Sequence, residues 1–139
     1  MGRANRMYRI ELAGKEIGVT ALEKSDSAMG VVFGKIIFST AISPYLLILE
    51  YCQTRAIQLN INDPALEAIG SRVIPELRVF RSDGVEIKGH GCLIEGFRED
   101  GYEITILGVT DPPFEEEFPH HLKADRKYWE LKSKKTFRP

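Results

Sequence analysis

The chain has 139 residues and a net charge of −1, with 43% apolar and 28% charged residues, as in an average globular protein. This length predicts a single domain over 1–139, and there is no run of about 18 apolar residues to predict a membrane-spanning helix. Cys52 and Cys92 stand far apart without a partner motif, which predicts reduced, buried thiols in a cytoplasmic protein.

Charge is divided unevenly along the chain. Seven basic and two acidic residues give residues 123–139 a charge of +5, which leaves −6 for residues 1–122. We expect a flexible N-terminus at 1–6, a folded body at 7–122 and a basic, partly helical tail at 123–139. Tyr128 and Trp129, with Leu131, are predicted to anchor the helical part of the tail on the body.

The first elements are predicted to be a hairpin and a long strand. Residues 8–12 and 16–22 alternate between apolar and polar, and a turn at Gly14 would pair Leu12 with Ile17. Residues 28–38 are rich in β-branched and aromatic side chains, which predicts a mostly buried strand.

Two helices and a strand are predicted next. Ser43 as N-cap and Pro44 at the first helical position predict the main helix, which runs to about Arg55. Residues 57–61 alternate as a short strand, and Asp63-Pro64 then predicts a short helix over residues 65–69 that Gly70 ends.

One octet occurs twice, as FRSDGVEI at 80–87 and FREDGYEI at 97–104. Asp-Gly between β-forming residues predicts a two-residue type I′ turn, which would pair Arg81 with Glu86 and Phe80 with Ile87. The second octet would pair in the same way, Arg98 with Glu103. Because the two hairpins share the strand from 85 to about 98, residues 77–109 predict a three-stranded meander.

The middle of this shared strand is interrupted by Gly89-His90-Gly91. Two glycines there predict a β-bulge or a close approach of backbone, and a bulge would reverse the faces of the residues beyond it. Without that reversal, the core face of the shared strand holds Val85, Ile87, Leu93 and Phe97. The complete pattern predicts an α+β fold: a mostly antiparallel sheet of about six or seven strands with one main helix packed on one face.

Two groups of residues are candidates for chemistry. His90 lies on the predicted bulge, and strand parity places Cys92 on the same face, which would permit a Cys–His pair. Glu116, His120 and His121 form the best acid–base or metal cluster by composition, although Pro119 is expected to break or start a helix between them. The alternatives are an ordinary strand histidine for His90 and a solvated linker pinned by Phe114 and Phe118 for the cluster.

The sequence leaves three functions open. It contains no phosphate-binding loop, nucleophile elbow or metal-ligand spacing, so no catalytic set, cofactor or metal site is predicted. The first hypothesis is a bacterial-type interaction module without catalytic activity, immunity- or adaptor-like, which binds a protein partner or a second copy through its acidic body or a sheet edge. The alternative is a small hydrolase or metal-dependent enzyme that uses His90 or His120/His121. The third is nucleic-acid binding through the basic tail, which the acidic body opposes.

Overall fold

The computed structural model describes residues 6–136, so the predictions for residues 1–5 and 137–139 lie outside the described part. The elements, in chain order, are β1 (Tyr8–Leu12), β2 (Lys15–Thr20), β3 (Lys24–Asp26), the 3₁₀ turn η2 (Ser27–Met29), β4 (Val31–Phe38), α1 (Pro44–Thr54), β5 (Leu59–Asp63), β6 (Ala68–Ser71), β7 (Leu77–Arg81), β8 (Gly91–Phe97), β9 (Gly101–Leu107), α2 (Phe114–Glu117) and α3 (Pro119–Thr136).

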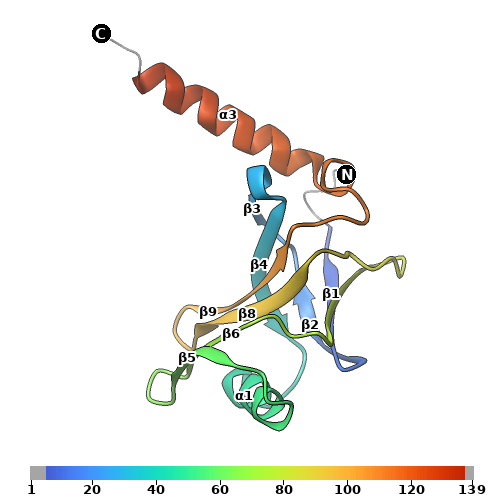
Figure 1. Cartoon of the computed structure of the whole chain (residues 1–139), viewed down its shortest axis with the longest axis vertical. Helices are drawn as coiled ribbons and strands as arrows, with labels where there is room; N and C mark the ends of the chain where they lie inside the picture. Colours follow the sequence, from blue (N-terminus) through green and yellow to red (C-terminus); the bar gives the residue numbers. More distant parts are fainter. Residues whose placement is uncertain (1–5, 137–139) are drawn as a thin grey trace.

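The strands of this region form one antiparallel sheet in the order β5-β6-β8-β9-β4-β2-β1-β7, with β3 paired to β4. The long strand β4 joins the two halves, because Val32 pairs with Ile106 of β9 while Ile36 pairs with Thr20 of β2. Gly34 and Lys35 still pair with β9, and a Cβ at Gly34 would come within 2.8 Å of the Leu22 backbone. The sheet is strongly curved, with α1 at one end of the body and α3 at the other (Figure 1).

The predicted class, α+β with a mostly antiparallel sheet, is confirmed. The strand count is wrong, since the described residues form nine strands rather than six or seven. The predicted main helix is α1, in which the Ser43 side chain caps the Leu46 amide and Tyr45, Ile48 and Cys52 are buried. A second long helix, α3, runs from Pro119 to Thr136, so it begins four residues before the predicted tail.

The short helix predicted after Asp63 is replaced by a β-hairpin. The Asp63 side chain accepts hydrogen bonds from the amides of Ala65 and Leu66, as a helix cap would. The same arrangement also starts a tight turn, and the chain then returns as β6, which pairs with β5 and with β8. Because the pairing of β6 with β8 is a tertiary contact, it favours the hairpin over the helix in a way that the local sequence does not show.

The N-terminal hairpin is present, but its predicted register is wrong. Ala13 and Gly14 both adopt positive φ, at 53° and 81°, and form the two central positions of the turn. Leu12 therefore pairs with Lys15 rather than with Ile17. Alanine rarely adopts this conformation, so the sequence favoured a turn centred one residue later.

Both octets make turns, but neither makes the predicted two-residue turn. Phe80 pairs with Glu86, and Phe97 pairs with Gly101, so each loop has three residues, 82–84 and 98–100. A type I′ turn needs positive φ at both central positions, whereas here Gly84 and Gly101 adopt it and the preceding aspartates do not. The predicted charge pairs are consequently wrong. Arg81 contacts Asp83 and Glu117, Arg98 contacts Glu67, and Glu103 contacts Lys24.

The predicted shared strand is interrupted at the glycines, and the faces reverse beyond them as a bulge would require. Within residues 85–90, Glu86 and Lys88 make isolated bridges, and β8 begins only at Gly91, whose φ is 149°. Cys92 and Ile94 are buried after this point, whereas Phe97 of the predicted core face is 37% exposed. Before it, Ile87 is buried as predicted, but Val85 is 38% exposed.

The core lies inside the curve of the sheet. Its fully buried side chains come from strands of both halves, among them Ile10, Val79, Ile94 and Ile104, and from Ile48 of α1. Among residues 6–136, no helix combines the length and the apolar content that a membrane crossing requires.

Candidate functional site

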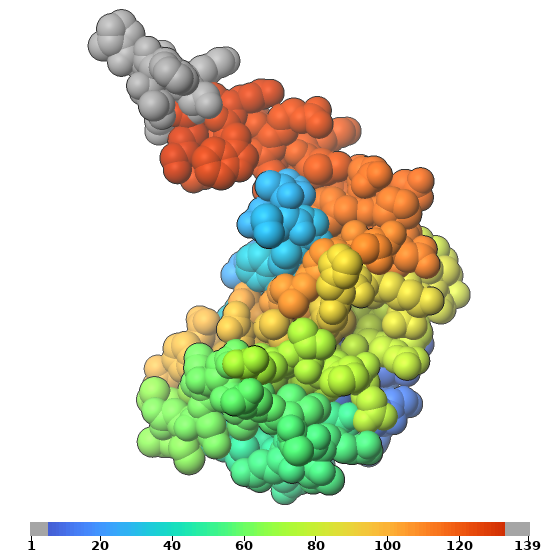
Figure 2. Space-filling model, in the orientation of Figure 1, coloured from blue at the N-terminus to red at the C-terminus, as the bar shows by residue number. Residues whose placement is uncertain are grey.

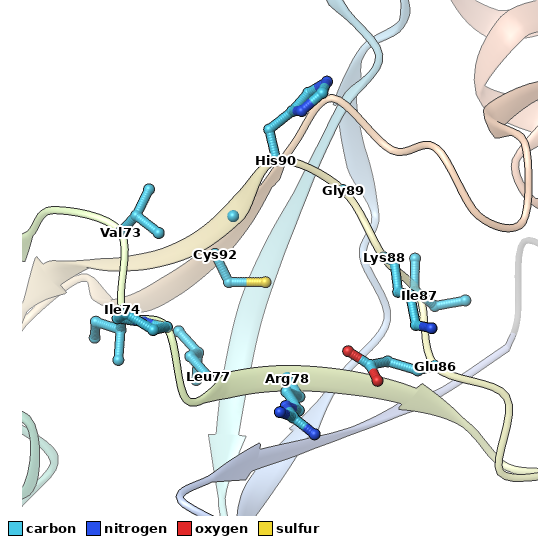
Figure 3. Close-up of a pocket in the computed structure, with 12 residues that line it drawn as sticks. Val73, Ile74, Leu77, Arg78, Glu86, Ile87, Lys88, Gly89, His90 and Cys92 are labelled. Atoms are coloured by element: carbon cyan, nitrogen blue, oxygen red, sulfur yellow. The ribbon is translucent and has the colours of Figure 1, made fainter.

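A cleft lies where the sheet fails to close, between β7 and the start of β8. It has a volume of about 550 Å³ and is lined by residues 73–75, 77–78 and 86–92; we refer to it as the β7–β8 cleft. His90 and Cys92 both line it, but their side chains diverge (Figure 3). His90 is exposed and its ring lies over Gly108, whereas Cys92 is only 7% exposed and belongs to the core. The predicted placement of the two side chains on one face is therefore wrong.

The chemistry of Cys92 is that of a buried thiol. Burial, and to a smaller extent the charge of Glu86, raise the pKa of Cys92 to about 12. A nucleophilic cysteine needs a lowered pKa, because the thiolate is the reactive form. The environment of Cys92 therefore opposes nucleophilic catalysis and suits packing.

The cluster predicted at Glu116, His120 and His121 is divided by the start of a helix. Pro119 begins α3, as expected for a proline at the first helical position, and Glu116 remains exposed on α2. His121 is buried, and its Nε2 donates a hydrogen bond to the Leu22 carbonyl at 2.8 Å. The rings of His120 and His121 pack on each other, with centroids 4.4 Å apart.

The linker interpretation of this segment is confirmed in one respect. Phe114 and Phe118 are buried, and their ring centroids lie 5.4 Å apart. The segment is not simply solvated, however, because Glu117 and His121 are buried as well. No group of three or more histidine, cysteine or acidic side chains in the described part of the chain is placed to hold a metal ion.

A buried carboxylate that was not predicted lies beside this segment. Glu117 is 1% exposed and accepts hydrogen bonds from Arg6 at 2.6 Å, from the Tyr8 hydroxyl at 2.7 Å and from Arg81 at 2.9 Å. We call these four residues the Glu117 cluster. It joins α2 to β1 and β7, where Tyr8 and Arg81 are directly paired. Arg6, predicted to belong to a flexible terminus, is one of its members.

The hydrogen bonds in the Glu117 cluster outweigh the cost of burying a charge. Burial by itself raises the pKa of Glu117, but the hydrogen bonds from Tyr8, Arg81 and Arg6 lower it, and the net pKa lies below the ordinary value. The pKa of Tyr8 is raised, first by burial and then by the neighbouring carboxylate, so its hydroxyl remains a donor. The cluster is an ionised, fully bonded clamp between elements.

Sequence reasoning missed this cluster for a physical reason. Phe114, Glu117 and Phe118 follow the spacing of one helix face, which was a signal that Glu117 is buried. Its partners come from the pairing of β1 with β7, strands that lie far apart in sequence. Local patterns do not reveal such a pairing.

The second unexpected feature is the exposure of α3. Only its first turns lie against β3 and η2, and the remainder extends beyond the body (Figures 1 and 2). Tyr128, Trp129 and Leu131, which were predicted to anchor the helix, are 57%, 58% and 55% exposed. That prediction is wrong, because the body ends before the helix reaches these residues.

Asp125 holds the first half of α3 in place. Its carboxylate accepts hydrogen bonds from the Ser25 hydroxyl at 3.0 Å and from the Ser27 amide at 3.1 Å. Burial raises the pKa of Asp125, whereas the hydrogen bonds from Ser25 and Ser27 lower it. The lowering is larger, so the net pKa lies below the ordinary value. The bonds fix the direction in which the helix leaves the body.

Replacing Asp125 with alanine is expected to loosen α3 without unfolding the sheet. Loss of the two bonds, at a partly exposed site, should cost about 1 kcal/mol. Amide hydrogen exchange should quicken in residues 121–132 and stay unchanged in β8 and β9. Equal quickening in β8 would contradict the assignment of Asp125 as a local anchor.

The described side chains therefore supply a half-open cleft, a structural carboxylate clamp and a projecting helix, and they do not bring the predicted chemical residues to one point. His90 borders the cleft, and His120 and His121 pack beside Phe118. Comparison with protein-family models, with curated proteins and with solved structures gave no match for this chain.

Proposed function

We propose that this chain is a non-catalytic interaction module that binds a partner protein through the projecting part of α3. The observation that carries the proposal is the exposure of three large apolar side chains, Tyr128, Trp129 and Leu131, on a helix that is anchored at its other end. An amphipathic helix that lies in the groove of another protein is a common mode of recognition. Tyrosine and tryptophan are enriched among the residues that contribute most to binding.

The exposed aromatic residues continue the side of α3 that already packs on the body. Residues three and four apart share a helix face, so His121, Asp125, Tyr128, Trp129 and Lys132 lie along one side. The first two contact the body, through Leu22 and η2. The other three form what we call the distal face of α3. A partner bound there would continue the packing surface that the first half of α3 already forms with the body.

The features of the distal face favour a protein over a nucleic acid. The Tyr128 and Trp129 rings meet edge to face at 5.3 Å, and Lys132 Nζ lies 5.9 Å and 5.1 Å from their centroids. These contacts cover part of the ring surface that unpaired bases would use for stacking. The sequence of α3 carries six basic and two acidic residues, while residues 1–122 carry −6 and would repel a polyanion. An apolar groove with an acidic rim fits this helix better.

Site-specific photo-cross-linking tests the proposal. The full chain, with a photoreactive amino acid at position 128, is produced in its native cells and irradiated. We expect a discrete protein adduct, which can be a second copy of this chain, that survives nuclease treatment. The matched control carries the same group at position 130, which is exposed and is neither three nor four residues from Tyr128, Trp129 or Leu131. This position lies on the opposite side of the helix and should give little adduct. Adducts that nuclease removes, or equal adducts at both positions, would contradict the proposal.

Trp129 provides an independent measurement, because it is the single tryptophan of the chain. Its indole is exposed, so its fluorescence should shift to shorter wavelength when the cross-linked partner, purified, is added. Tyr128→Ala should weaken that binding by at least about tenfold, since hot-spot residues typically contribute about 2 kcal/mol or more. A single-stranded oligonucleotide should cause no comparable, salt-sensitive change.

A further inference from the structure

The β7–β8 cleft has the dimensions of a small-molecule site and lies apart from α3. β7 is the last strand in the sheet order and is not a hydrogen-bonded neighbour of β8. The gap is bridged at one end by the bond from the Ile74 amide to the Cys92 carbonyl, at 2.9 Å, and at the other by the pairing of Phe80 with Glu86. The cleft between these bridges has a volume of about 550 Å³, within the range of ligand pockets.

The interior of the cleft is apolar. Ile74, Leu77, Ile87 and Cys92 line it, and each is less than a tenth exposed. They are part of the packed core, so the floor of the cleft is already formed. A ligand with an apolar portion would gain burial here without rearranging the sheet.

The rim of the cleft is basic, in contrast to the body around it. Arg78 and Lys88 lie on the rim beside His90, and Glu86 is the single acidic residue among those that line the cleft (Figure 3). With histidine counted as neutral, two basic and one acidic residue give this lining a charge of +1. Residues 1–122 carry −6 as a whole, so this is a local reversal of charge. The ion pairs within 4.0 Å among the described residues do not include Arg78 or Lys88.

We propose that the β7–β8 cleft binds a small organic anion. Its carboxylate or phosphate group would contact Arg78 and Lys88 at the rim, and its apolar part would lie on Leu77 and Ile87. A guanidinium group presents paired donors that match both carboxylate and phosphate, and the ammonium group adds charge. An apolar pocket with a few convergent polar groups is the usual form of such sites. The proposal does not depend on the function proposed for α3.

Titration followed by NMR of backbone amides tests this site. The probes are phenyl phosphate and benzoate as aromatic anions, inorganic phosphate as the anion alone, and benzyl alcohol as the apolar group alone. We expect at least one aromatic anion to shift the amide signals of residues 87–92 in a saturable way. Its Kd should be at least about tenfold lower than those of inorganic phosphate and benzyl alcohol, because both parts of the site contribute. Absence of a saturable shift with both aromatic anions would overturn the proposal.

Charge-matched variants separate the cleft from general electrostatic attraction. Arg78→Ala combined with Lys88→Ala should raise the Kd of the bound anion by about tenfold or more. Lys123→Ala combined with Arg126→Ala removes the same charge from exposed positions of α3 and should leave that Kd unchanged. Equal weakening in both double variants would show attraction to overall charge and would overturn the assignment of the site.

Discussion

Replacing Glu117 with alanine is expected to lower the free energy of unfolding by about 3 kcal/mol, because the change removes the common acceptor of a buried cluster. The Tyr8 hydroxyl would remain inside the core without its acceptor, since Tyr8 is only 1% exposed. Arg6 and Arg81 would lose a partner while 27% and 22% exposed, so water can reach them, which keeps the loss below that of a fully buried ion pair. Chemical denaturation in urea measures the change.

Glu116→Ala is the matched control for this prediction. It removes the same charge one residue earlier, but Glu116 is exposed on α2. Its effect should stay within about 0.5 kcal/mol, as is usual for surface substitutions. Similar losses for the two variants would show that the helix, rather than the cluster, determines the stability of this region.

The Glu117 cluster also predicts a dependence of stability on pH. The folded pKa of Glu117 is lowered, so its contribution is complete above the ordinary pKa of 4.5 and is lost as pH falls through the folded pKa. Wild type should therefore exceed Glu117→Gln in unfolding free energy by a constant amount above about pH 5.5, and the difference should shrink in more acidic solution. A difference that grows on acidification would contradict the ionised state of Glu117.

Replacing Gly96 with alanine is expected to destabilise the protein by about 3 kcal/mol or more, from backbone strain together with a steric clash. Gly96 lies in β8 with a φ of 153°, which side chains rarely adopt. A Cβ there would come within 2.2 Å of the Gly101 carbonyl oxygen and 2.6 Å of the Tyr102 Cα. Both contacts are with backbone of the paired strand β9, so relief requires the hairpin to move.

Gly14→Ala separates strain from clash. Gly14 also has positive φ, at 81°, but a Cβ there would meet nothing within 4 Å among the described atoms. Alanine should therefore cost only about 1 kcal/mol at this position. Thermal and urea unfolding of the two variants compare the losses directly. An equal loss at both positions would exclude the clash at Gly96 as the cause.

Local patterns in the sequence predicted most of the elements. The cap at Ser43, the proline at the start of α1, the β-branched run of β4 and the Asp-Gly loops each depend on residues a few positions apart. The interruption at Gly89 and Gly91 was also visible, with the reversal of faces beyond it. The turn lengths were wrong because Asp-Gly fits both a two-residue turn and a three-residue loop, and the sequence does not distinguish them.

Features that depend on distant pairing were decided only by the tertiary structure. Residues 65–69 belong to a hairpin because β6 pairs with β8, and Glu117 has partners because β1 pairs with β7. The β7–β8 cleft exists because those two strands do not pair, and Trp129 is exposed because the body ends before α3 does. The sequence by itself determined the α+β class and the positions of the N-terminal hairpin and of the two octet turns, though not their registers, since these positions follow from local spacing and backbone preference. The candidate sites depend on which distant strands meet, and that is a property of the packed chain.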